Sequence, residues 1–202
     1  KFLSKYKAVS VREESAKLCL HEIGIESEQL LDPTFMLDRK EWNKFASPRL
    51  VEEPYLCVYL PYNIADKDLI YLSIRKIATN KGLKVVTFSY SNRKDKYADI
   101  TFCNANPSVF LSLMSNADFI VTNSFHGTAF SVNLNKQFYV YMPSGFKTRI
   151  VSILELCGLE NRALSDEITE VALNEEIDYE PVNLVLEGER QRAIEFLRRA
   201  LS

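Results

Sequence analysis

The segment over residues 123–130, Asn-Ser-Phe-His-Gly-Thr-Ala-Phe, carries the residues whose types and spacing best suit chemistry. It follows a short apolar run over residues 117–122 that is typical of a buried strand, and it leads into the apolar-periodic pattern of a helix. A strand, a tight polar turn and a helix N-terminus present backbone N–H groups to an anion. His126, one of two histidines in the chain, stands beside Gly127, whose missing side chain lets a ligand approach the backbone. This pattern predicts a site for chemistry on a phosphorylated substrate.

Other polar residues follow the ends of further predicted strands. Arg12 closes an apolar run over residues 7–11, and Tyr62 and Asn63 follow a strong apolar run that ends at residue 60. Strands separated by helices imply a parallel sheet, and ligands of such sheets bind beyond the carboxyl ends of the strands. We therefore expect Arg12, the Tyr62–Asn63 pair and His126 to converge in one crevice. The predicted substrate-binding residues around it are Asn123, Ser124, Gly127, Thr128, Arg149, Tyr62 and Asn63.

Apolar runs alternate with helical patterns along most of the chain, which predicts an α/β, Rossmann-like fold with a parallel sheet and helices on both faces. The predicted strands cover residues 7–11, 30–35, 55–60, 84–89, 99–103, 117–123 and 137–142. Pro33 confines the second of these to an edge or a connection. The predicted helices cover residues 13–22, 38–53 (with a linker), 66–82, 108 onward, 130–134, 148–157 and 187–201. The acidic stretch over residues 166–183 is weakly patterned and is expected to be a solvated connection.

Composition excludes several functions. The 202 residues are 47% hydrophobic and 26% charged, as in ordinary globular proteins, and the net charge of −2 argues against a sequence-independent nucleic-acid binder. No apolar run is long enough to span a bilayer, and no signal-peptide pattern opens the chain. We therefore expect no nucleic-acid partner, no transmembrane segment and a cytoplasmic location. The chain begins with Lys, which suggests a piece of a longer protein.

The four cysteines are widely separated and form no C-x-x-C pair. Each has apolar neighbours in the sequence, so we expect buried, reduced thiols, as in a cytosolic protein. Neither this spacing nor the two distant histidines suit a zinc site, and no metal is expected. The cysteines are Cys19, Cys57, Cys103 and Cys157.

An ordered set of motifs resembles the polysaccharide pyruvyl transferase family. The set covers most of the chain, from about residue 10 to residue 162, and it is far more specific than any one motif alone. Its members are Ser-Val-Arg-Glu-Glu-Ser at residues 10–15, Leu-Asp-Pro-Thr at 31–34, Thr-Asn-Ser-Phe-His-Gly-Thr at 122–128, Asn-Lys-Gln-Phe at 135–138, Arg149, and Leu-Glu-Asn-Arg at 159–162.

The resemblance implies both a reaction and an architecture. Members of this family transfer the carboxyvinyl group of phosphoenolpyruvate to sugar hydroxyls, which forms a cyclic pyruvate ketal and releases phosphate. They are similar to GT-B glycosyltransferases, in which two Rossmann-like halves face a cleft. Residues 1–202 are then expected to be a single Rossmann-like domain, the C-terminal half of a longer enzyme, with residues 187–201 as its terminal helix.

The same resemblance implies the partners of the protein. The donor substrate is phosphoenolpyruvate and no cofactor is needed. The acceptor is a saccharide or a lipid-linked saccharide used in exopolysaccharide biosynthesis. The expected location is the cytoplasm, with peripheral association at the inner face of the membrane left open.

Individual roles follow where the residues match the family motifs. His126 matches the catalytic histidine, which is proposed to protonate the methylene carbon of the donor, and its unperturbed pKa near neutrality suits a general acid. Arg12 matches an arginine that holds the anionic groups of the donor, for which a planar guanidinium is well shaped. Some members carry an arginine two residues before the histidine, where this chain has Ser124. Arg149, or a residue outside this chain, is expected to supply the missing charge.

Each of these residues also has a purely structural interpretation. His126 could be an ordinary histidine at a helix N-terminus, and Arg12 could pair with a surface carboxylate. Asn123 and Ser124 could cap the following helix. Arg149 stands in the first turn of a predicted helix, where the helix dipole disfavours a cation, so either an anionic ligand or a salt bridge would explain it.

Two other functions fit the same fold. The first is a glycosyltransferase that uses a nucleotide sugar, which would need a base pocket and a carboxylate to hold the ribose; Glu13 is the only obvious candidate for that carboxylate. The second is a non-catalytic half-domain that docks a partner, an alternative that the serine at position 124 favours.

Overall fold

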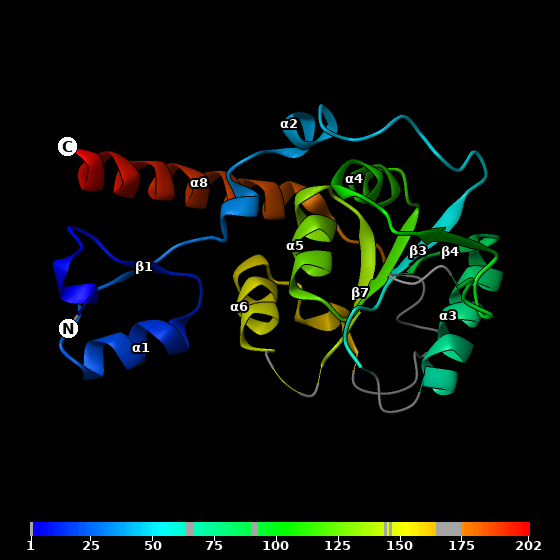
Figure 1. Ribbon diagram of the computed structural model, residues 1–202, viewed down its shortest axis with the longest axis horizontal. Helices are drawn as coiled ribbons and strands as arrows, with labels where there is room; N and C mark the ends of the chain where they lie inside the picture. The colour runs from blue at the N-terminus through cyan, green and yellow to red at the C-terminus, as the bar shows by residue number, and fades with distance from the viewer. Residues whose placement is uncertain (1, 64–66, 90–92, 144, 146, 165–174) are drawn as a thin grey trace.

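A parallel six-stranded sheet forms the body of the computed structural model, which describes residues 2–63, 67–89, 93–143, 145, 147–164 and 175–202 (Figure 1). The strand order is β5-β4-β3-β6-β7-β8. The strands are β3 (Tyr55–Tyr59), β4 (Lys84–Ser89), β5 (Ile100–Cys103), β6 (Phe119–Thr122), β7 (Gln137–Tyr141) and β8 (Ala163–Leu164). The chain runs outward from β3 to β5 and then returns to β6, which is the dinucleotide-fold order with a switch point between β3 and β6.

Both faces of this sheet are buried, and successive side chains of each strand point alternately into one face and the other. In β3, Tyr55 and Cys57 join one hydrophobic cluster, whereas Leu56 and Val58 join the other. A parallel sheet needs such cover on both faces, because its crossover helices lie on each side. The continuous apolar runs that predicted these strands are therefore explained by burial on both faces of the sheet.

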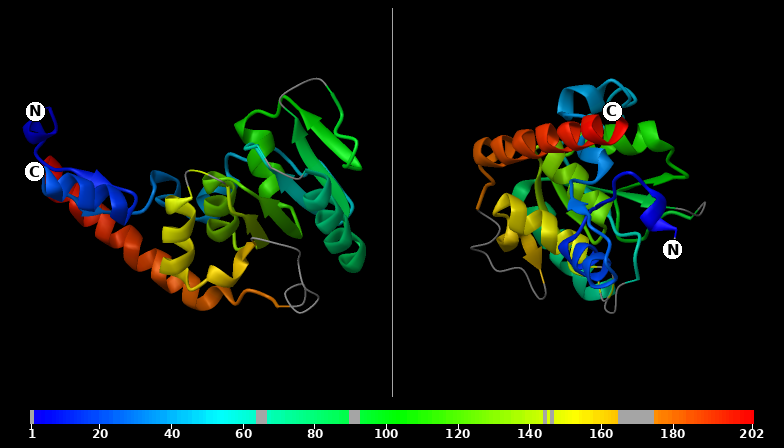
Figure 2. Two further views of the ribbon diagram at one scale, coloured as in Figure 1. Left: turned by 90° about the horizontal axis from the view of Figure 1, so that it is seen from below. Right: turned by 90° about the vertical axis from the view of Figure 1, so that its left-hand side faces the viewer.

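Helices cover each face, as Figures 1 and 2 show. On one face α3 (Lys67–Lys81) packs Ile74 and Ile77 against the strands. The other face is covered by α4 (Pro107–Ser115), α5 (Phe125–Asn133) and α6 (Thr148–Cys157), followed by the short 3-10 turn η3 (Glu160–Arg162). This architecture confirms the predicted α/β, Rossmann-like class.

The N-terminal residues form a second, smaller unit. It comprises η1 (Leu3–Lys5), β1 (Ser10–Val11), α1 (Glu14–Glu22) and β2 (Glu28–Gln29), in which β1 and β2 pair as a separate parallel sheet. The long helix α8 (Tyr179–Leu201) extends from the large sheet to this unit, so both termini lie at the same end of the molecule (Figure 2). Leu30, Ala193 and Phe196 form the small core between them.

Hydrogen bonds fix the connection between the two units. It contains η2 (Pro33–Phe35) and α2 (Arg39–Asn43). Trp42 Nε1 and Asn133 Nδ2 donate to the carbonyl of Thr34 at 2.8 and 3.1 Å, and Arg190 Nε donates to the carbonyl of Phe35 at 2.7 Å. The segment with the Leu-Asp-Pro-Thr motif is thereby held against α5 and α8.

Several predicted elements have different bounds. The strand expected over residues 30–35 is wrong: Asp32 caps the 3-10 turn η2 and Pro33 opens it, so pairing is confined to β2. The strand expected over residues 7–11 is limited to β1. The last helix, expected from residue 187, begins at Tyr179 and is capped by Asp178. The expected helix cap at residue 66, and residues 165–174 of the acidic stretch, lie outside the described residues.

The expectation of four buried cysteines is half wrong. Cys57 and Cys157 are buried, and burial raises the pKa of both thiols, that of Cys157 to about 12. Cys19 and Cys103 are exposed, because α1 is a short surface helix and Cys103 ends the edge strand β5. All four are free thiols. Within the described ranges, no helix combines the length and the apolar character needed to cross a membrane.

Candidate active site

The junction between β6 and α5 carries the predicted histidine. Ser124 is the N-cap of α5, Phe125 its first residue and His126 its second, so the helix begins before the predicted start at Phe130. His126 therefore lies in the first helical turn rather than in a turn that precedes the helix. Its side chain is exposed, at the end of a strand that is itself buried.

Gly127 is required by packing, which corrects the interpretation that it admits a ligand. A Cβ at this position would lie 2.1 Å from Thr122 Oγ1, so only glycine allows α5 this close to β6. The Thr122 hydroxyl is itself fixed, because it donates to the carbonyl of Tyr59 at 2.7 Å and accepts from Ser124 N at 3.1 Å. Thr128 is fully buried and its hydroxyl donates to the carbonyl of Ser124 at 3.0 Å.

Asn123 connects the ends of the two central strands. Its buried side chain accepts from Tyr62 N at 3.3 Å and donates to the carbonyl of Tyr62 at 2.9 Å, which ties the loop after β3 to the end of β6. Ser124 is buried, and its side chain makes no capping hydrogen bond. Among the described residues, no side chain caps α5, and the N–H groups of a helix N-terminus are the groups that attract an anion.

Three cavities surround this junction. The strand-end cavity, of about 350 Å³, lies beyond β3 and β4 and includes Tyr62, Asn63, Tyr71 and Asp95. The arginine cavity, of about 290 Å³, includes Arg12, Phe125, Arg149 and Arg192. The aromatic recess, of about 280 Å³, includes Tyr59, Phe88, Ala105, Asn106, Phe110 and His126.

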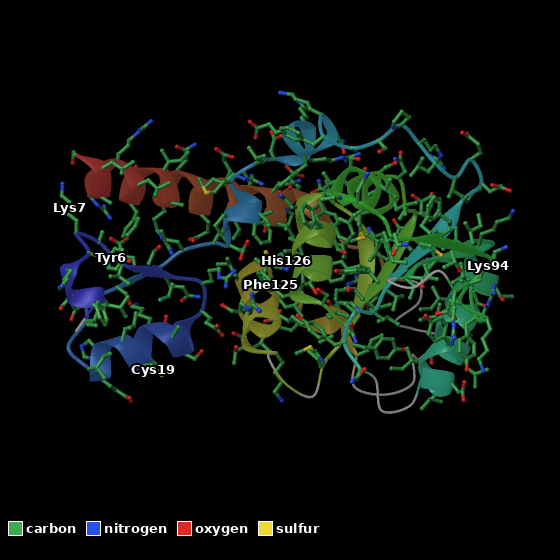
Figure 3. The ribbon with its side chains drawn as sticks, in the orientation of Figure 1. Tyr6, Lys7, Cys19, Lys94, Phe125 and His126 are labelled. Carbon is green, nitrogen blue, oxygen red and sulfur yellow. The ribbon has the colours of Figure 1, made fainter. Side chains whose placement is uncertain are left out.

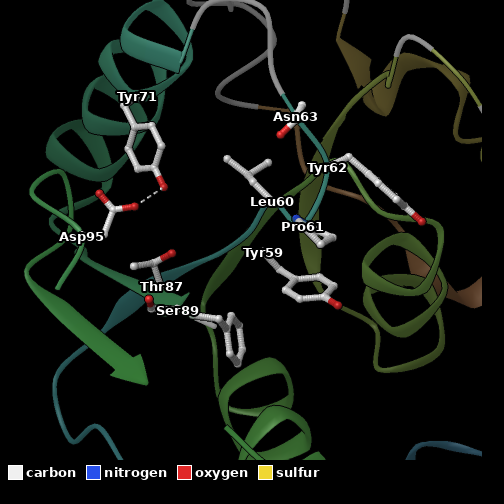
Figure 4. A pocket seen from close by; sticks show the side chains of 10 residues that line it. Tyr59, Leu60, Pro61, Tyr62, Asn63, Tyr71, Thr87, Ser89 and Asp95 are labelled. Carbon is white, nitrogen blue, oxygen red and sulfur yellow. Dashed lines mark hydrogen bonds between the residues drawn. The ribbon is translucent and has the colours of Figure 1, made fainter. Parts of the chain in front are cut away.

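In the strand-end cavity, Tyr62 and Asn63 lie along one side and Tyr71 and Asp95 along the other (Figure 4). The hydroxyl of Tyr71 donates to Asp95 Oδ2 at 3.0 Å. Burial raises the pKa of Tyr71, and the adjacent carboxylate raises it further. Tyr71 is therefore a neutral donor that holds Asp95 at the end of β4.

In the arginine cavity, two of the three guanidinium groups have carboxylate partners. Arg12 Nη1 lies 2.5 Å from Asp32 Oδ2, and Arg192 Nη1 lies 2.7 Å from Glu189 Oε1. Burial opposes the ionisation of Asp32, but hydrogen bonds from Thr34 and Arg12 outweigh it and hold the pKa of Asp32 below its usual value. Asp32 is the partner that sequence reasoning missed; its signal was the Asp-Pro-Thr turn.

Arg149, from the first turn of α6, is held differently. Its guanidinium carbon lies 4.7 Å from the centroid of the Phe125 ring, which is a cation–π contact. Within the described part of the chain, it has no carboxylate partner. Phe125 precedes His126, and the two ring centroids lie 5.3 Å apart. Both residues are labelled on α5 in Figure 3. Arg149 thus brings a positive charge to the α5 N-terminus, where this chain has Ser124 instead of an arginine.

The expected single crevice is wrong. Arg12 follows β1, which lies outside the six-stranded sheet, and it lines the arginine cavity together with Arg149. His126 lines the aromatic recess, whereas Tyr62 and Asn63 line the strand-end cavity. The recess and the strand-end cavity are adjacent, because they share Tyr59, Phe88 and Ser89 as walls. Phe125 and His126, consecutive on α5, face the arginine cavity and the recess respectively.

Within the described ranges, no group of three or more His, Cys, Asp or Glu side chains is placed to hold a metal ion.

The fold and the site together define an α/β, Rossmann-like domain with an exposed histidine in the first turn of the helix that follows a central strand. The sequence model of the family described as polysaccharide pyruvyl transferase matches residues 1–145. The chain belongs to this family.

Solved structures of similar fold are distant in sequence. The glycotransferase of kitacinnamycin is 12% identical with a TM-score of 0.51, over 93% of this chain and 61% of that one. The UDP-GlcNAc 2-epimerase of Methanocaldococcus jannaschii, in complex with UDP-GlcNAc and UDP, is 15% identical with a TM-score of 0.48, over 95% of this chain and 61% of that one. The glycosyltransferase SnogD from Streptomyces nogalater is 12% identical with a TM-score of 0.46, over 74% and 41%. The chain thus spans less than two thirds of each of these proteins. No curated protein sequence matches it.

Proposed function

We propose that this protein transfers a pyruvyl group from phosphoenolpyruvate to saccharide hydroxyls and forms a pyruvate ketal during polysaccharide biosynthesis. One observation carries the proposal. His126 is exposed in the first turn of α5, which follows the buried central strand β6, and Arg149 lies over the ring of the preceding residue, Phe125. Membership of the pyruvyl transferase family supports the same reaction.

Binding of the donor follows from the charges around α5. Phosphoenolpyruvate carries a phosphate and a carboxylate, and the uncapped N–H groups of α5 together with the helix dipole attract one of these anions. Arg149 supplies a fixed positive charge beside them. Arg12, which lines the arginine cavity, is about half exposed and uses one nitrogen on Asp32, so its other N–H groups can donate to the anionic groups of the donor. No cofactor takes part in this scheme.

The proposed chemistry begins with proton transfer. His126 donates its proton to the methylene carbon of the enol phosphate, and an oxocarbenium-like centre forms at the adjacent carbon. One sugar hydroxyl adds to that centre and its proton returns to His126. The second hydroxyl then displaces phosphate, which leaves with the proton of that hydroxyl. One hydroxyl proton thus ends in the new methyl group and the other on inorganic phosphate, so atoms and charges balance.

The acceptor in this proposal is a saccharide, either free or linked to a lipid. A lipid-linked acceptor would bring the protein to the cytoplasmic face of a membrane as a peripheral enzyme. Exopolysaccharide synthesis is the process that such an acceptor would serve.

The test is the replacement of His126 by alanine. Phosphate release from phosphoenolpyruvate, measured in the presence of saccharide acceptors, should fall at least ~100-fold, the lower limit for loss of a general acid. His21→Ala is the matched control, because that histidine is exposed on α1, away from all three cavities, and should leave the rate unchanged. A rate for His126→Ala within a few-fold of wild type would remove His126 from the mechanism.

A second candidate function is favoured by the strand-end cavity. Asp95 lies beyond the end of β4, where Rossmann-like folds hold a ribose, so a nucleotide sugar could be the donor. Thermal-shift measurements with phosphoenolpyruvate and with uridine and guanosine diphosphosugars separate the two functions. Stabilisation by a nucleotide sugar that Asp95→Asn abolishes, without any response to phosphoenolpyruvate, would favour the glycosyltransferase.

A further inference from the structure

The aromatic recess beside His126 is built from three aromatic rings of different elements. Tyr59 comes from β3, Phe88 from β4 and Phe110 from α4, and their ring centroids lie 5.1 to 5.5 Å apart. All three side chains are only partly buried, so they present ring surface to the cavity. Phe110 also packs against the buried Phe130 at 5.6 Å, which anchors the cluster on the core. The rings form a rigid, apolar wall that the proposed donor chemistry does not use.

The charge of the recess differs from that of the arginine cavity. Among the described residues that line the recess, none is Asp, Glu, Lys or Arg, and His126 is the one basic side chain. An occupant with two anionic groups would lose its hydration there and could gain only His126 as a cationic partner, whereas the arginine cavity offers Arg12 and Arg149. The recess therefore suits an uncharged ligand, whereas phosphoenolpyruvate suits the arginine side of α5.

A polar group at the rim gives the recess directionality. Asn106 is the N-cap of α4: its Oδ1 accepts from Val109 N at 3.0 Å and from the Ser108 hydroxyl at 2.8 Å. These bonds fix the orientation of the amide, and its Nδ2 has no partner among the described residues. An apolar wall with a few placed polar groups is the usual pattern of a small-ligand site, and about 280 Å³ lies near the lower end of the range for such sites.

We propose that the aromatic recess is the subsite for the acceptor and binds one neutral hexopyranose ring. The C–H face of the sugar packs on Tyr59, Phe88 and Phe110, because the electron-rich faces of aromatic rings attract polarised C–H groups. Asn106 Nδ2 donates to a ring hydroxyl, and the hydroxyl pair to be bridged faces His126. This assignment rests on the proposed function, since it places donor and acceptor on the two sides of the α5 N-terminus.

Filling the recess tests the assignment. Ala105 is half-buried on its wall, so Ala105→Trp should occupy the space without removing a core contact. The KM for the saccharide acceptor should rise at least ~10-fold, while the KM for phosphoenolpyruvate stays within about twofold. Leu72→Trp, which adds the same ring at an exposed position of α3, is the matched control and should behave as wild type. An unchanged acceptor KM, or an equal rise for phosphoenolpyruvate, overturns the assignment.

A gentler variant tests the rim. Asn106→Ser keeps a good N-cap for α4 but removes the amide donor, so the acceptor KM should rise about 3- to 10-fold with an unchanged melting temperature. An unchanged acceptor KM in this variant would contradict the proposed hydrogen bond from Asn106.

Failure of the proposed function can be told apart from failure of this subsite. Saturation-transfer NMR with methyl glucopyranoside, galactopyranoside and mannopyranoside measures sugar binding without turnover. Transfer to the C–H protons of one face in wild type and His126→Ala, but not in Ala105→Trp, supports the subsite even if no phosphate is released. Absence of transfer in wild type, equal transfer in Ala105→Trp, or displacement of the glycoside by uridine diphosphate overturns it.

Discussion

Replacement of Gly127 by alanine is the sharpest structural test of the β6–α5 junction. A Cβ at this position would lie 2.1 Å from Thr122 Oγ1 and 2.8 Å from Thr122 Cβ, and the latter atom is backbone-attached and cannot rotate away. Thr122 is fully buried and its hydroxyl bonds both Tyr59 and Ser124. Either α5 moves away from β6 or Thr122 gives up its hydrogen bonds.

The expected size follows from three terms. Overpacking of a tight core contact costs about 1–3 kcal/mol. Loss of one or both hydrogen bonds of Thr122 adds about 1 kcal/mol each. The higher helix propensity of alanine offsets about 1 kcal/mol of this destabilisation. The net loss of unfolding free energy is then about 1–4 kcal/mol, or roughly 2–16 °C in the melting temperature of a chain of this size.

Thermal and urea unfolding of the variant measure this loss, and a second glycine provides the control. Gly188 lies within α8, is exposed, and has nothing within 4 Å of an added Cβ, so Gly188→Ala should stabilise by about 0.5–1 kcal/mol. The same substitution is thus expected to have opposite signs at two helical sites. A Gly127→Ala protein as stable as Gly188→Ala would refute the close-contact argument for the junction.

Three further predictions concern charged groups. Arg149→Ala should weaken phosphoenolpyruvate binding about 10- to 100-fold in calorimetry, because a charge-assisted contact is lost; a change below twofold would exclude Arg149 from the donor site. Asp32→Asn should lower the unfolding free energy by about 2 kcal/mol at pH 7 and raise the KM for phosphoenolpyruvate more than it lowers kcat, because Asp32 orients Arg12. The native pKa of Asp32 lies below the unfolded value of 3.8, so this stability difference is present above that pH and should shrink as the pH falls through the native pKa; a pH-independent difference would contradict the pairing. Lys136 donates to the carbonyl of Ala117, and burial lowers its pKa from 10.5 to about 8, so native Lys136 is destabilising when charged. Relative to Lys136→Met, the wild type should therefore gain about 1–2 kcal/mol in unfolding free energy between pH 7.5 and 9.5, and equal pH profiles for the two proteins would contradict this.

Local patterns predicted the body of the fold well. The apolar runs at β3, β4, β6 and β7 and the caps and glycines between them identified strands, helices and their parallel arrangement. These features depend on the period of hydrophobic residues and on backbone preferences, which act over a few residues. The position of His126 at a strand end followed from the same reasoning.

Errors arose where contacts between different elements decide the structure. Residues 30–35 are apolar enough for a strand, but Asp32 bonds Thr34 and Arg12 and turns the chain into η2. The start of α5 was misplaced because Gly127 and its neighbours were assigned to a turn, whereas Gly127 is the residue that lets the first turn of α5 pack against Thr122 of β6. Neither effect has a periodic signature.

The sequence by itself determined the strand–helix alternation, the order of the motifs and the histidine at the end of a buried strand, because each of these depends on a pattern of neighbouring residues. Only the tertiary structure decided that Arg12 belongs to a separate small sheet, that Arg149 reaches the ring before His126, and that aromatic side chains of β3, β4 and α4 meet beside that histidine. These contacts join residues far apart in the chain. Which of these residues meet depends on how whole elements pack, and this is determined only when the sheet and its helices assemble.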